Sequence, residues 1–186
     1  MNKAFAKAHY ECDSVLSLYA CHSLIQMAIA SHRTAPYVIQ VVDSLLSEYP
    51  SADVTVVGYS LGAAIALLDG VFLRLQLDPQ IKVKVIGYGM PRVGNQDFAT
   101  FVDAILPNEV VRINNMRDPV PVVPGLQFGY VHCSGEIHIQ EQSGEWDKCP
   151  GPENPSPLCT DGTVTSLANA TLTDHVGPYN KIMMRC

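Results

Sequence analysis

The sequence lacks several of the features that mark common protein classes. No cluster of Lys and Arg interrupts a chain whose 18 acidic and 12 basic residues leave a formal charge of −6, whereas a nucleic-acid-binding protein would need a basic stripe. No run of about 18 or more apolar residues is present, so we expect no membrane-spanning helix. No phosphate-cradling glycine loop or cluster of metal ligands occurs either. We therefore expect no nucleic-acid partner, no cofactor and no metal ion.

Charged residues are also scarce, at 16 % against roughly 25 % in an average domain, whereas apolar residues make up 47 %. This composition is too apolar for a disordered chain and is ample for a hydrophobic core. The 186 residues contain no internal repeat, and their number is typical of one domain. We therefore expect a single globular domain over residues 1–186.

The six cysteines include no Cys-x-x-Cys pair, which argues against a zinc ribbon or a thioredoxin-type redox site. Cys149 and Cys159 flank a turn-rich segment, and a disulfide between them would indicate an oxidising compartment. Two free thiols in a reduced protein are the alternative. Asn169 begins an Asn-Ala-Thr glycosylation sequon, which also points to secretion. The sequence predicts no pairing for the other cysteines, which are Cys12, Cys21, Cys133 and Cys186.

The first thirty residues only loosely imitate a signal peptide. Lys3 and Lys7 precede an apolar stretch over residues 15–30, but Glu11 and Asp13 stand where the positive region belongs. We interpret this segment as not a functional signal. The expectation is a secreted type of protein whose chain begins late.

From residue 34 onward the pattern alternates between helix and strand. Apolar residues at helical spacing predict a helix that begins near Pro36 and ends at Pro50. Short β-branched runs predict buried strands. The expected order is strand 53–59, helix 61–75, strand 82–88, helix 96–105 and strand 109–114. It is typical of an α/β domain with a parallel sheet. Extended segments around residues 134–135 are candidates for a hairpin, and residues 144–170 are expected to be mostly loop.

Residues 58–62, Gly-Tyr-Ser-Leu-Gly, match the pattern Gly-x-Ser-x-Gly between a predicted strand and a predicted helix. A serine on such a sharp turn exposes its hydroxyl above the sheet, and the crowded turn favours small residues two positions to either side. The helix N-terminus also favours the negative charge that develops in acyl transfer. Ser60 is therefore the candidate nucleophile, and the N–H of Leu61 is the candidate oxyanion donor. A buried serine in a tight turn is the alternative.

In an α/β-hydrolase the triad runs along the chain as Ser, then Asp or Glu, then His. Asp118 follows the third predicted strand, at the edge of the sheet where Ser60 also emerges. Without Ser60 it would be an ordinary turn aspartate before proline. His175 lies in a loop near the C-terminus, where the third member of the triad belongs. We therefore predict Asp118 as the acid and His175 as the base.

The other histidines are weaker candidates for the base. Three of them precede the serine, which the chain order disfavours: His9, His22 and His32. His132 and His138 follow Asp118 closely, in strand-like sequence. Glu136 and His138 alternate onto one face of that strand and could hint at a pair of metal ligands, but no third ligand occurs at a suitable spacing.

At these residues the chain resembles the fungal class 3 lipase family, whose members are secreted triacylglycerol lipases and related feruloyl esterases. Residues 88–95, Tyr-Gly-Met-Pro-Arg-Val-Gly-Asn, are similar to the family's Tyr-Gly-x-Pro-Arg-Val-Gly-Asn segment. Residues 118–121 resemble the stretch around the family's acid, residues 135–139 a following strand, and residues 174–179 the histidine loop. The resemblance extends from about residue 22 to the C-terminus.

The resemblance implies an α/β-hydrolase fold and a serine carboxylic ester hydrolase, with Ser60, Asp118 and His175 as nucleophile, acid and base. It implies a secreted triacylglycerol lipase acting on a lipid or other ester, at a lipid–water interface. A feruloyl-type esterase is the alternative within the same family. The segment between Cys149 and Cys159 also resembles a disulfide-closed loop of the family.

The chain departs from the family pattern at three places. Tyr59 stands where members commonly have histidine, and Cys133 where proline is usual. Residues 1–20 contain no equivalent of the family's N-terminal part, which holds early strands, the lid helix and a Gly-Thr or Gly-Ser segment with the second oxyanion donor. Cys186, which pairs with an N-terminal cysteine in relatives, therefore has no evident partner. We expect a truncated domain with an exposed sheet edge, and a catalytically impaired domain that binds lipid or a partner is a further alternative.

Overall fold

The structure is a computed structural model that describes the backbone of residues 15–184. Side chains are described from residue 26 onward, with the exception of residue 27. The predictions for His9, Cys12 and Cys186 lie outside the described residues, and so do those for the side chains of Cys21 and His22.

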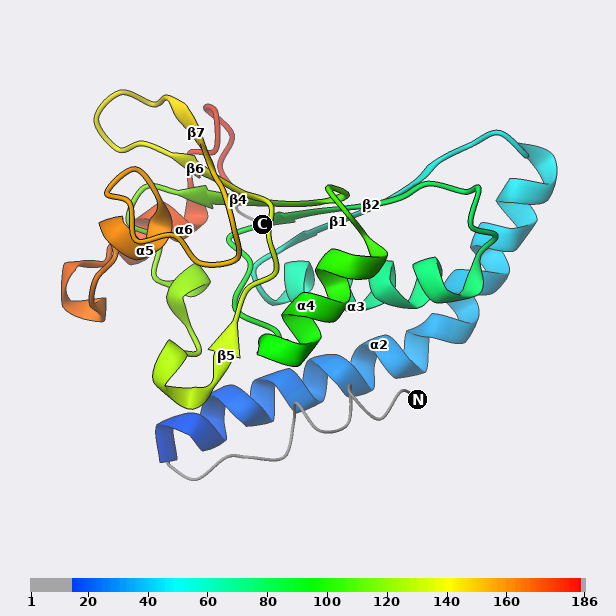
Figure 1. Ribbon diagram of the computed structural model, residues 1–186, viewed down its shortest axis with the longest axis horizontal. Helices are drawn as coiled ribbons and strands as arrows, with labels where there is room; N and C mark the ends of the chain where they lie inside the picture. The colour runs from blue at the N-terminus through cyan, green and yellow to red at the C-terminus, as the bar shows by residue number, and fades with distance from the viewer. Residues whose placement is uncertain (1–14, 185–186) are drawn as a thin grey trace.

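Five strands form one twisted sheet in the order β1-β2-β4-β6-β7, which gives the fold its central layer (Figure 1). The first four strands in this order run parallel, and β7 is antiparallel to β6. Their bounds are Val54–Tyr59 for β1, Val83–Tyr88 for β2, Val110–Asn115 for β4, Glu136–Ile139 for β6 and Trp146–Cys149 for β7. Two short strands, β3 (Gly94–Asn95) and β5 (Tyr130–Val131), pair separately. The predicted α/β fold with a mostly parallel sheet is confirmed.

The longer helices lie together on one side of this sheet. Helix α3 packs against β1 and β2, and α2 packs on the outside of α3 (Figure 1). The longer helices are α2 (Val15–Glu48), α3 (Leu61–Gln76) and α4 (Gln96–Ile105). The shorter ones are α5 (Thr160–Thr163), α6 (Leu172–Val176) and the 3-10 turns η1 (Val120–Val122), η2 (Leu126–Phe128) and η3 (Leu167–Asn169). No helix of the described residues combines the length and the apolar character needed to cross a membrane.

The prediction that a helix begins near Pro36 is wrong, because Pro36 lies inside the 34-residue helix α2. Proline removes one helical N–H donor and normally marks a helix start or a break. Here the residues before it are held by tertiary contacts. Ser31 donates a 2.6 Å hydrogen bond to Asp69 of α3, and Ala35 is buried. These contacts with α3 favour the helix on both sides of the proline.

The predicted hairpin around residues 134–135 is also wrong. The strand before it, β5, pairs with β3, whereas the strand after it, β6, joins the central sheet beside β4. Gly135 has φ +104°, and a β-carbon there would lie 2.0 Å from the carbonyl oxygen of Val110. The chain therefore passes from one sheet to the other through a point that only glycine can occupy. Residues 144–170 are mostly loop, as predicted, and also contain β7 and two short helices.

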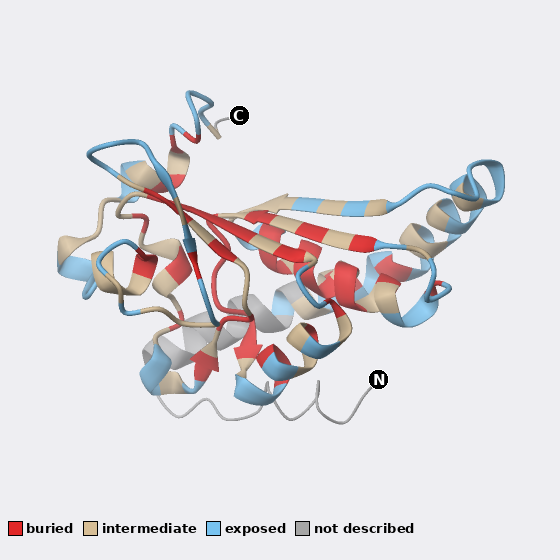
Figure 2. Cartoon of the chain, turned by 45° about the horizontal axis from the view of Figure 1, so that its top comes forward, coloured by how far each residue is buried: buried red, intermediate tan, exposed pale blue. Residues whose placement is uncertain are grey.

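The apolar core lies between the sheet and the helices, where buried residues follow β2 and the inner face of α3 (Figure 2). Strand β1 is the edge of the sheet, and its burial alternates along the chain. Val54 and Val56 pack toward the core, whereas Val57 is 59 % exposed. The strand predicted over residues 53–59 is confirmed as β1, but the prediction that it is buried is wrong, because an edge strand with one open face can bury only alternate side chains.

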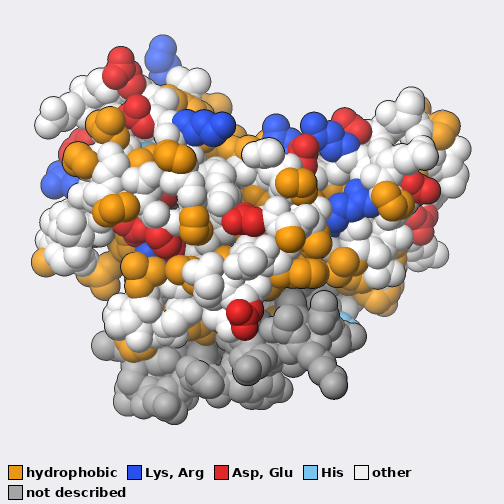
Figure 3. Space-filling model, in the orientation of Figure 1, with side chains coloured by type: hydrophobic (Ala, Val, Ile, Leu, Met, Phe, Trp, Pro, Cys, Tyr) orange, Lys and Arg blue, Asp and Glu red, His pale blue; other side chains and the backbone are white. Residues whose placement is uncertain are grey.

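The described surface seen in Figure 3 mixes side-chain types. Lys and Arg lie scattered among acidic and apolar groups on this face. This face, as far as it is described, shows no basic stripe of the kind that a nucleic-acid backbone requires.

Candidate active site

Ser60 lies in the turn that joins the end of β1 to the start of α3. Its backbone has φ 56° and ψ −129°, a conformation that L-residues seldom adopt outside functional turns. The N–H of Ser60 donates to the carbonyl oxygen of Tyr88 at 2.9 Å, which ties the turn to β2. A β-carbon at Gly58 would lie 2.2 Å from the carbonyl oxygen of Gly62, so crowding excludes a side chain at Gly58. At Gly62 a β-carbon would meet nothing within 4 Å, and the expected crowding on that side is absent.

The side chains of Ser60, His175 and Asp118 meet at the carboxyl edge of the parallel strands. Nε2 of His175 lies 2.8 Å from Oγ of Ser60, and Nδ1 of His175 lies 2.8 Å from Oδ2 of Asp118. Asp118 is 1 % exposed and His175 is 8 % exposed, so water has little access to the bond between them. The imidazole therefore bridges a hydroxyl and a buried carboxylate.

Two further groups hold the carboxylate of Asp118. The backbone N–H of Val120 donates to Oδ1 at 2.8 Å, and the phenol of Tyr179 donates to Oδ2 at 3.3 Å. Burial, together with the negative charge of Asp118, raises the pKa of Tyr179, so its phenol stays protonated and remains a donor. The carboxylate thus has a hydrogen bond on each oxygen in addition to the one with His175, which fixes its orientation.

His175 belongs to the short helix α6, which is anchored to the end of β4. Nδ2 of Asn115 donates to the carbonyl oxygen of Asp174 at 2.9 Å. The backbone N–H of Arg117 donates to the carboxylate of Asp174 at 3.1 Å. Burial raises the pKa of Asp174. Sequence reasoning assigned no role to Asn115, although a polar residue at the end of a buried strand was the signal that could have identified it.

Leu61, the predicted oxyanion donor, is the first residue of α3. Backbone N–H groups in the first turn of a helix have no acceptor within the helix, and they point toward its N-terminal end. Ser60 is the residue immediately before this turn. The N–H of Leu61 therefore belongs to a set of donors that carries partial positive charge beside the Ser60 hydroxyl.

The structure places the other two candidate bases away from Ser60. Nε2 of His132 is 2.8 Å from the carbonyl oxygen of Pro121. Burial and the nearby charge of Arg112 lower the pKa of His132, so it is neutral at physiological pH. The ring of His138 lies between two backbone carbonyls at 2.8 and 2.9 Å. Both histidines are therefore engaged in internal contacts.

The hinted metal pair of Glu136 and His138 is not supported by the geometry. Glu136 accepts a 2.8 Å hydrogen bond from the backbone N–H of Thr160, and His138 is engaged as above. Within the described part of the chain, one group of residues brings potential ligand atoms together, Glu136 with Cys149 and Cys159. The two sulfurs form a disulfide, which confirms the predicted pairing and leaves no thiolate for a metal. Cys133 is a free, buried cysteine, and burial raises its pKa to about 11.

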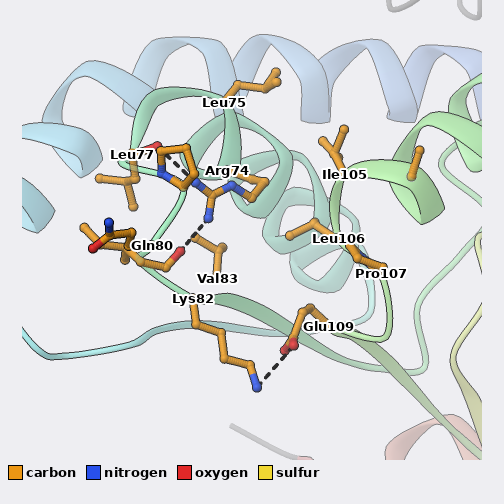
Figure 4. A pocket seen from close by; sticks show the side chains of 13 residues that line it. Arg74, Leu75, Leu77, Gln80, Lys82, Val83, Ile105, Leu106, Pro107 and Glu109 are labelled. Carbon is orange, nitrogen blue, oxygen red and sulfur yellow. Dashed lines mark hydrogen bonds and ion pairs between the residues drawn. The ribbon is translucent and has the colours of Figure 1, made fainter.

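A cavity of about 710 Å³ lies where β2 and β4 begin (Figure 4). Ser60 follows the last residue of β1, so the cavity is at the opposite end of the parallel strands. Arg74 donates to backbone carbonyls of the turn after α3, among them that of Asp78 at 2.8 Å. Lys82 forms a 3.1 Å ion pair with Glu109. These charged groups around the cavity are engaged with each other or with the backbone, and none of the lining residues is a nucleophile next to a base. The arrangement of a hydroxyl, an imidazole and a buried carboxylate is found at the carboxyl ends of the strands, beside Ser60.

The sequence of this chain is similar to those of a known family and of characterised proteins. The family model described as "Lipase (class 3)" matches residues 1–128. A secreted mono- and diacylglycerol lipase of Malassezia globosa, MDL3, is 37 % identical over 139 residues, covering 74 % of this chain and 44 % of the relative.

Two solved structures are similar to this fold. The lipase of Rhizopus microsporus var. chinensis superposes with a TM-score of 0.71 and 31 % identity, over 83 % of this chain and 53 % of that one. A triacylglycerol lipase whose catalytic centre is described as a serine protease triad superposes with a TM-score of 0.70 and 26 % identity, over 82 % and 57 %. The chain thus spans about half the length of the relatives it matches.

Proposed function

We propose that this chain, which belongs to the class 3 lipase family, hydrolyses carboxylic esters of the acylglycerol type with Ser60 as nucleophile. The family resemblance predicted from the sequence is confirmed by the family match, although the match covers residues 1–128 and so begins before residue 22, where the resemblance was predicted to begin. The observation that carries the proposal is the continuous hydrogen-bonded chain from Ser60 through His175 to the buried carboxylate of Asp118. We propose that residues 1–186 act as one domain and that the reaction needs no cofactor or metal.

In the proposed reaction Oγ of Ser60 attacks the ester carbonyl while Nε2 of His175 takes the hydroxyl proton. The protonated imidazole then gives this proton to the leaving alcohol, and an acyl-enzyme remains on Ser60. A water molecule, deprotonated by the same nitrogen, attacks the acyl-enzyme and releases the carboxylic acid. Asp118 holds the tautomer of His175 that presents Nε2 as acceptor and stabilises the imidazolium.

The developing oxyanion needs donors that are in place before the reaction. The N–H of Leu61 and the N-terminus of α3 supply positive charge at this point. Each oxyanion donor contributes about 10²–10³ in rate. The proposed role of Leu61 therefore accounts for part of the rate enhancement, through a backbone group that a change of side chain leaves in place.

The comparisons support the substrate class and the location. The Malassezia relative is named as a secreted mono- and diacylglycerol lipase, and one structural neighbour is a triacylglycerol lipase. The disulfide between Cys149 and Cys159 is stable in an oxidising compartment. We therefore propose a secreted protein with a lipid ester as substrate.

Ester hydrolysis by wild type and Ser60→Ala tests this proposal. We expect wild type to hydrolyse nitrophenyl esters with a short and a long acyl chain, with a preference for the long chain, and Ser60→Ala to hydrolyse neither. Asp118→Asn, which leaves the wrong histidine tautomer, lowers kcat by about 10⁴. A phosphonate probe labels wild type and not Ser60→Ala. Hydrolysis that survives Ser60→Ala would overturn the assignment, and a preference for a cinnamoyl-type aromatic acid would indicate a feruloyl esterase instead.

A further inference from the structure

Tyr59, the residue before the nucleophile, contacts His175 in two ways. Its phenol donates a 2.9 Å hydrogen bond to the backbone carbonyl oxygen of His175. Its ring also stacks on the imidazole, with centroids 4.8 Å apart and an angle of 23° between the planes. Neither contact takes part in the proton transfers proposed above. Both act on His175, the residue that transfers the proton.

The alternation of β1 explains why Tyr59 reaches His175. Val56 packs toward α3 and the main core, whereas Tyr59 lies on the opposite face of the sheet, in a smaller cluster with Ile113 and Tyr179. The last residue of the strand thus turns its ring toward α6, while the next residue, Ser60, begins the turn into α3. One strand end therefore positions both the nucleophile and the ring against its base.

The hydrogen bond from Tyr59 supplies a donor that the backbone of α6 lacks. This helix has only five residues, and His175 is in its last turn. Carbonyl groups in the last turn of a helix have no N–H partner within the helix. The phenol of Tyr59 supplies a donor to one of them and links α6 to β1, whereas Asn115 and Arg117 link α6 to the end of β4.

We propose that Tyr59 is a positioning residue for ester hydrolysis, an inference that rests on the proposed function. The hydrogen bond holds the backbone of His175 so that Nε2 stays within reach of the Ser60 hydroxyl. The face of the phenol ring carries negative partial charge and stabilises the imidazolium that forms when Ser60 gives up its proton. Errors of about 1 Å in such placements cost about 10² in rate.

Tyr88 provides a matched control. It ends β2 in direct register with Tyr59 at the end of β1, and it belongs to the same apolar cluster. Its ring packs edge-on against Tyr179 at 5.5 Å, much as that of Tyr59 does at 6.5 Å. No ring contact or hydrogen bond joins the side chain of Tyr88 to His175 among the described residues. Substitution of the two tyrosines therefore changes similar packing, and only one of them contacts the base.

The experiment compares four variants, Tyr59→Phe, Tyr59→Leu, Tyr88→Phe and Tyr88→Leu, with wild type on a short-chain nitrophenyl ester. Tyr59→Phe keeps the ring and loses one hydrogen bond, so kcat falls about threefold to tenfold. Tyr59→Leu loses both contacts, and kcat falls by about 10². KM stays within about twofold of wild type, since Tyr59 acts through His175 and not on the ester. The rate of phosphonate labelling of Ser60 falls in parallel with kcat, and Tyr88→Phe and Tyr88→Leu keep both rates within about twofold.

Thermal unfolding of each variant separates positioning from stability. Comparable losses of stability in the two leucine variants, with a loss of kcat only in Tyr59→Leu, support the inference. Equal losses of kcat at the two positions would overturn it, and so would a change confined to KM. If wild type shows neither hydrolysis nor labelling that depends on Ser60, the proposed function fails and the inference with it. Active wild type with unchanged Tyr59 variants overturns the inference alone.

Discussion

Gly89 lies so close to His175 that a β-carbon at this position would come within 2.8 Å of Nδ1 of the imidazole. The same β-carbon would lie 2.8 Å from Oδ2 of Asp118, so it would intrude on the hydrogen bond between the two side chains. Gly89 also has φ +54°, a backbone angle that residues with a β-carbon rarely adopt. Gly89 follows β2 directly, and the absence of a side chain here lets the histidine and the carboxylate approach each other over the end of the strand.

We expect Gly89→Ala to lower Ser60-dependent ester hydrolysis at least tenfold, because the new methyl group displaces His175 or Asp118. Gly129→Ala is the matched control. Gly129 also has a positive φ, +78°, but a β-carbon there would meet nothing within 4 Å. Both variants bear a conformational cost of about 1–2 kcal/mol, measured as a loss of unfolding free energy. Equal activity in the two variants would contradict the steric argument.

The open edge of the sheet predicts a second pair of variants. Val57 is 59 % exposed on the edge strand β1, which carries no charge or proline to discourage pairing with another chain. Val57→Lys should reduce light scattering on heating and change the unfolding free energy by less than about 0.5 kcal/mol. Val56 packs toward the core, so Val56→Lys should destabilise the fold by more than about 1 kcal/mol. Similar unfolding free energies for the two variants would show that the alternation along β1 is not as described.

The disulfide between Cys149 and Cys159 closes a loop with a sequence separation of 10 residues. Replacing both cysteines with alanine should lower the unfolding free energy by about 2–3 kcal/mol, because the unfolded chain gains freedom. Urea unfolding with and without a reductant tests this expectation. Reductant should bring wild type down to the level of the double variant and leave the double variant unchanged. A further loss in the double variant would point to an effect of the reductant elsewhere.

The cluster around Arg92 predicts a dependence of stability on pH. The guanidinium of Arg92 is buried and binds Glu153 at 2.9 Å and Asp161 at 2.8 Å. Burial and the neighbouring Glu153 raise the pKa of Asp161 to about 7, from 3.8 in a free side chain. Burial acts to raise the pKa of Glu153 as well, but its hydrogen bonds with Arg92 and Asp161 outweigh this and lower it. One cation is thus shared by two carboxyl groups, and Asp161 retains its proton below about pH 7.

The sign of the effect follows from proton binding. Between about pH 4 and about pH 7 the folded protein keeps the Asp161 proton that the unfolded chain has released, so this group's contribution to the unfolding free energy falls as pH rises. Glu153 contributes with the opposite sign, but only below about pH 4.5. Asp161→Asn should therefore gain stability relative to wild type between about pH 5 and about pH 8.

Urea unfolding of wild type and Asp161→Asn at several pH values measures this difference. The titration of His132 contributes to both proteins and cancels in the comparison. Asp53→Asn, a change at an exposed position, measures the general effect of removing one negative charge. A constant difference between Asp161→Asn and wild type across this pH range would refute the shared-proton interpretation.

Local sequence predicted the turn at Ser60 well because its causes are local. A β-branched run, a glycine where strand and helix cross closely, and a helix-forming segment lie within about twenty residues, and neighbouring residues decide such a turn. The predicted helix over residues 96–105 is likewise confirmed, with Asn95 accepting a hydrogen bond from the N–H of Phe98 at its start. The beginning of α2 and the pairing of β5 and β6 were predicted wrongly, since contacts with α3 and β3 decide them.

The sequence by itself determined the order of strands and helices, the place of Ser60 between a strand and a helix, and the candidates that follow it along the chain. The sequence also favoured His175 over His132 and His138 as the base. Only the tertiary structure brought its Nε2 within 2.8 Å of the Ser60 hydroxyl, because residues 115 positions apart meet only when the parallel sheet brings the strand ends together. The tertiary structure also decided the roles of Gly89 and Tyr59 beside His175. Their effect depends on distances of 2.8 and 2.9 Å to a residue more than 80 positions away, and such distances exist only once the sheet has formed.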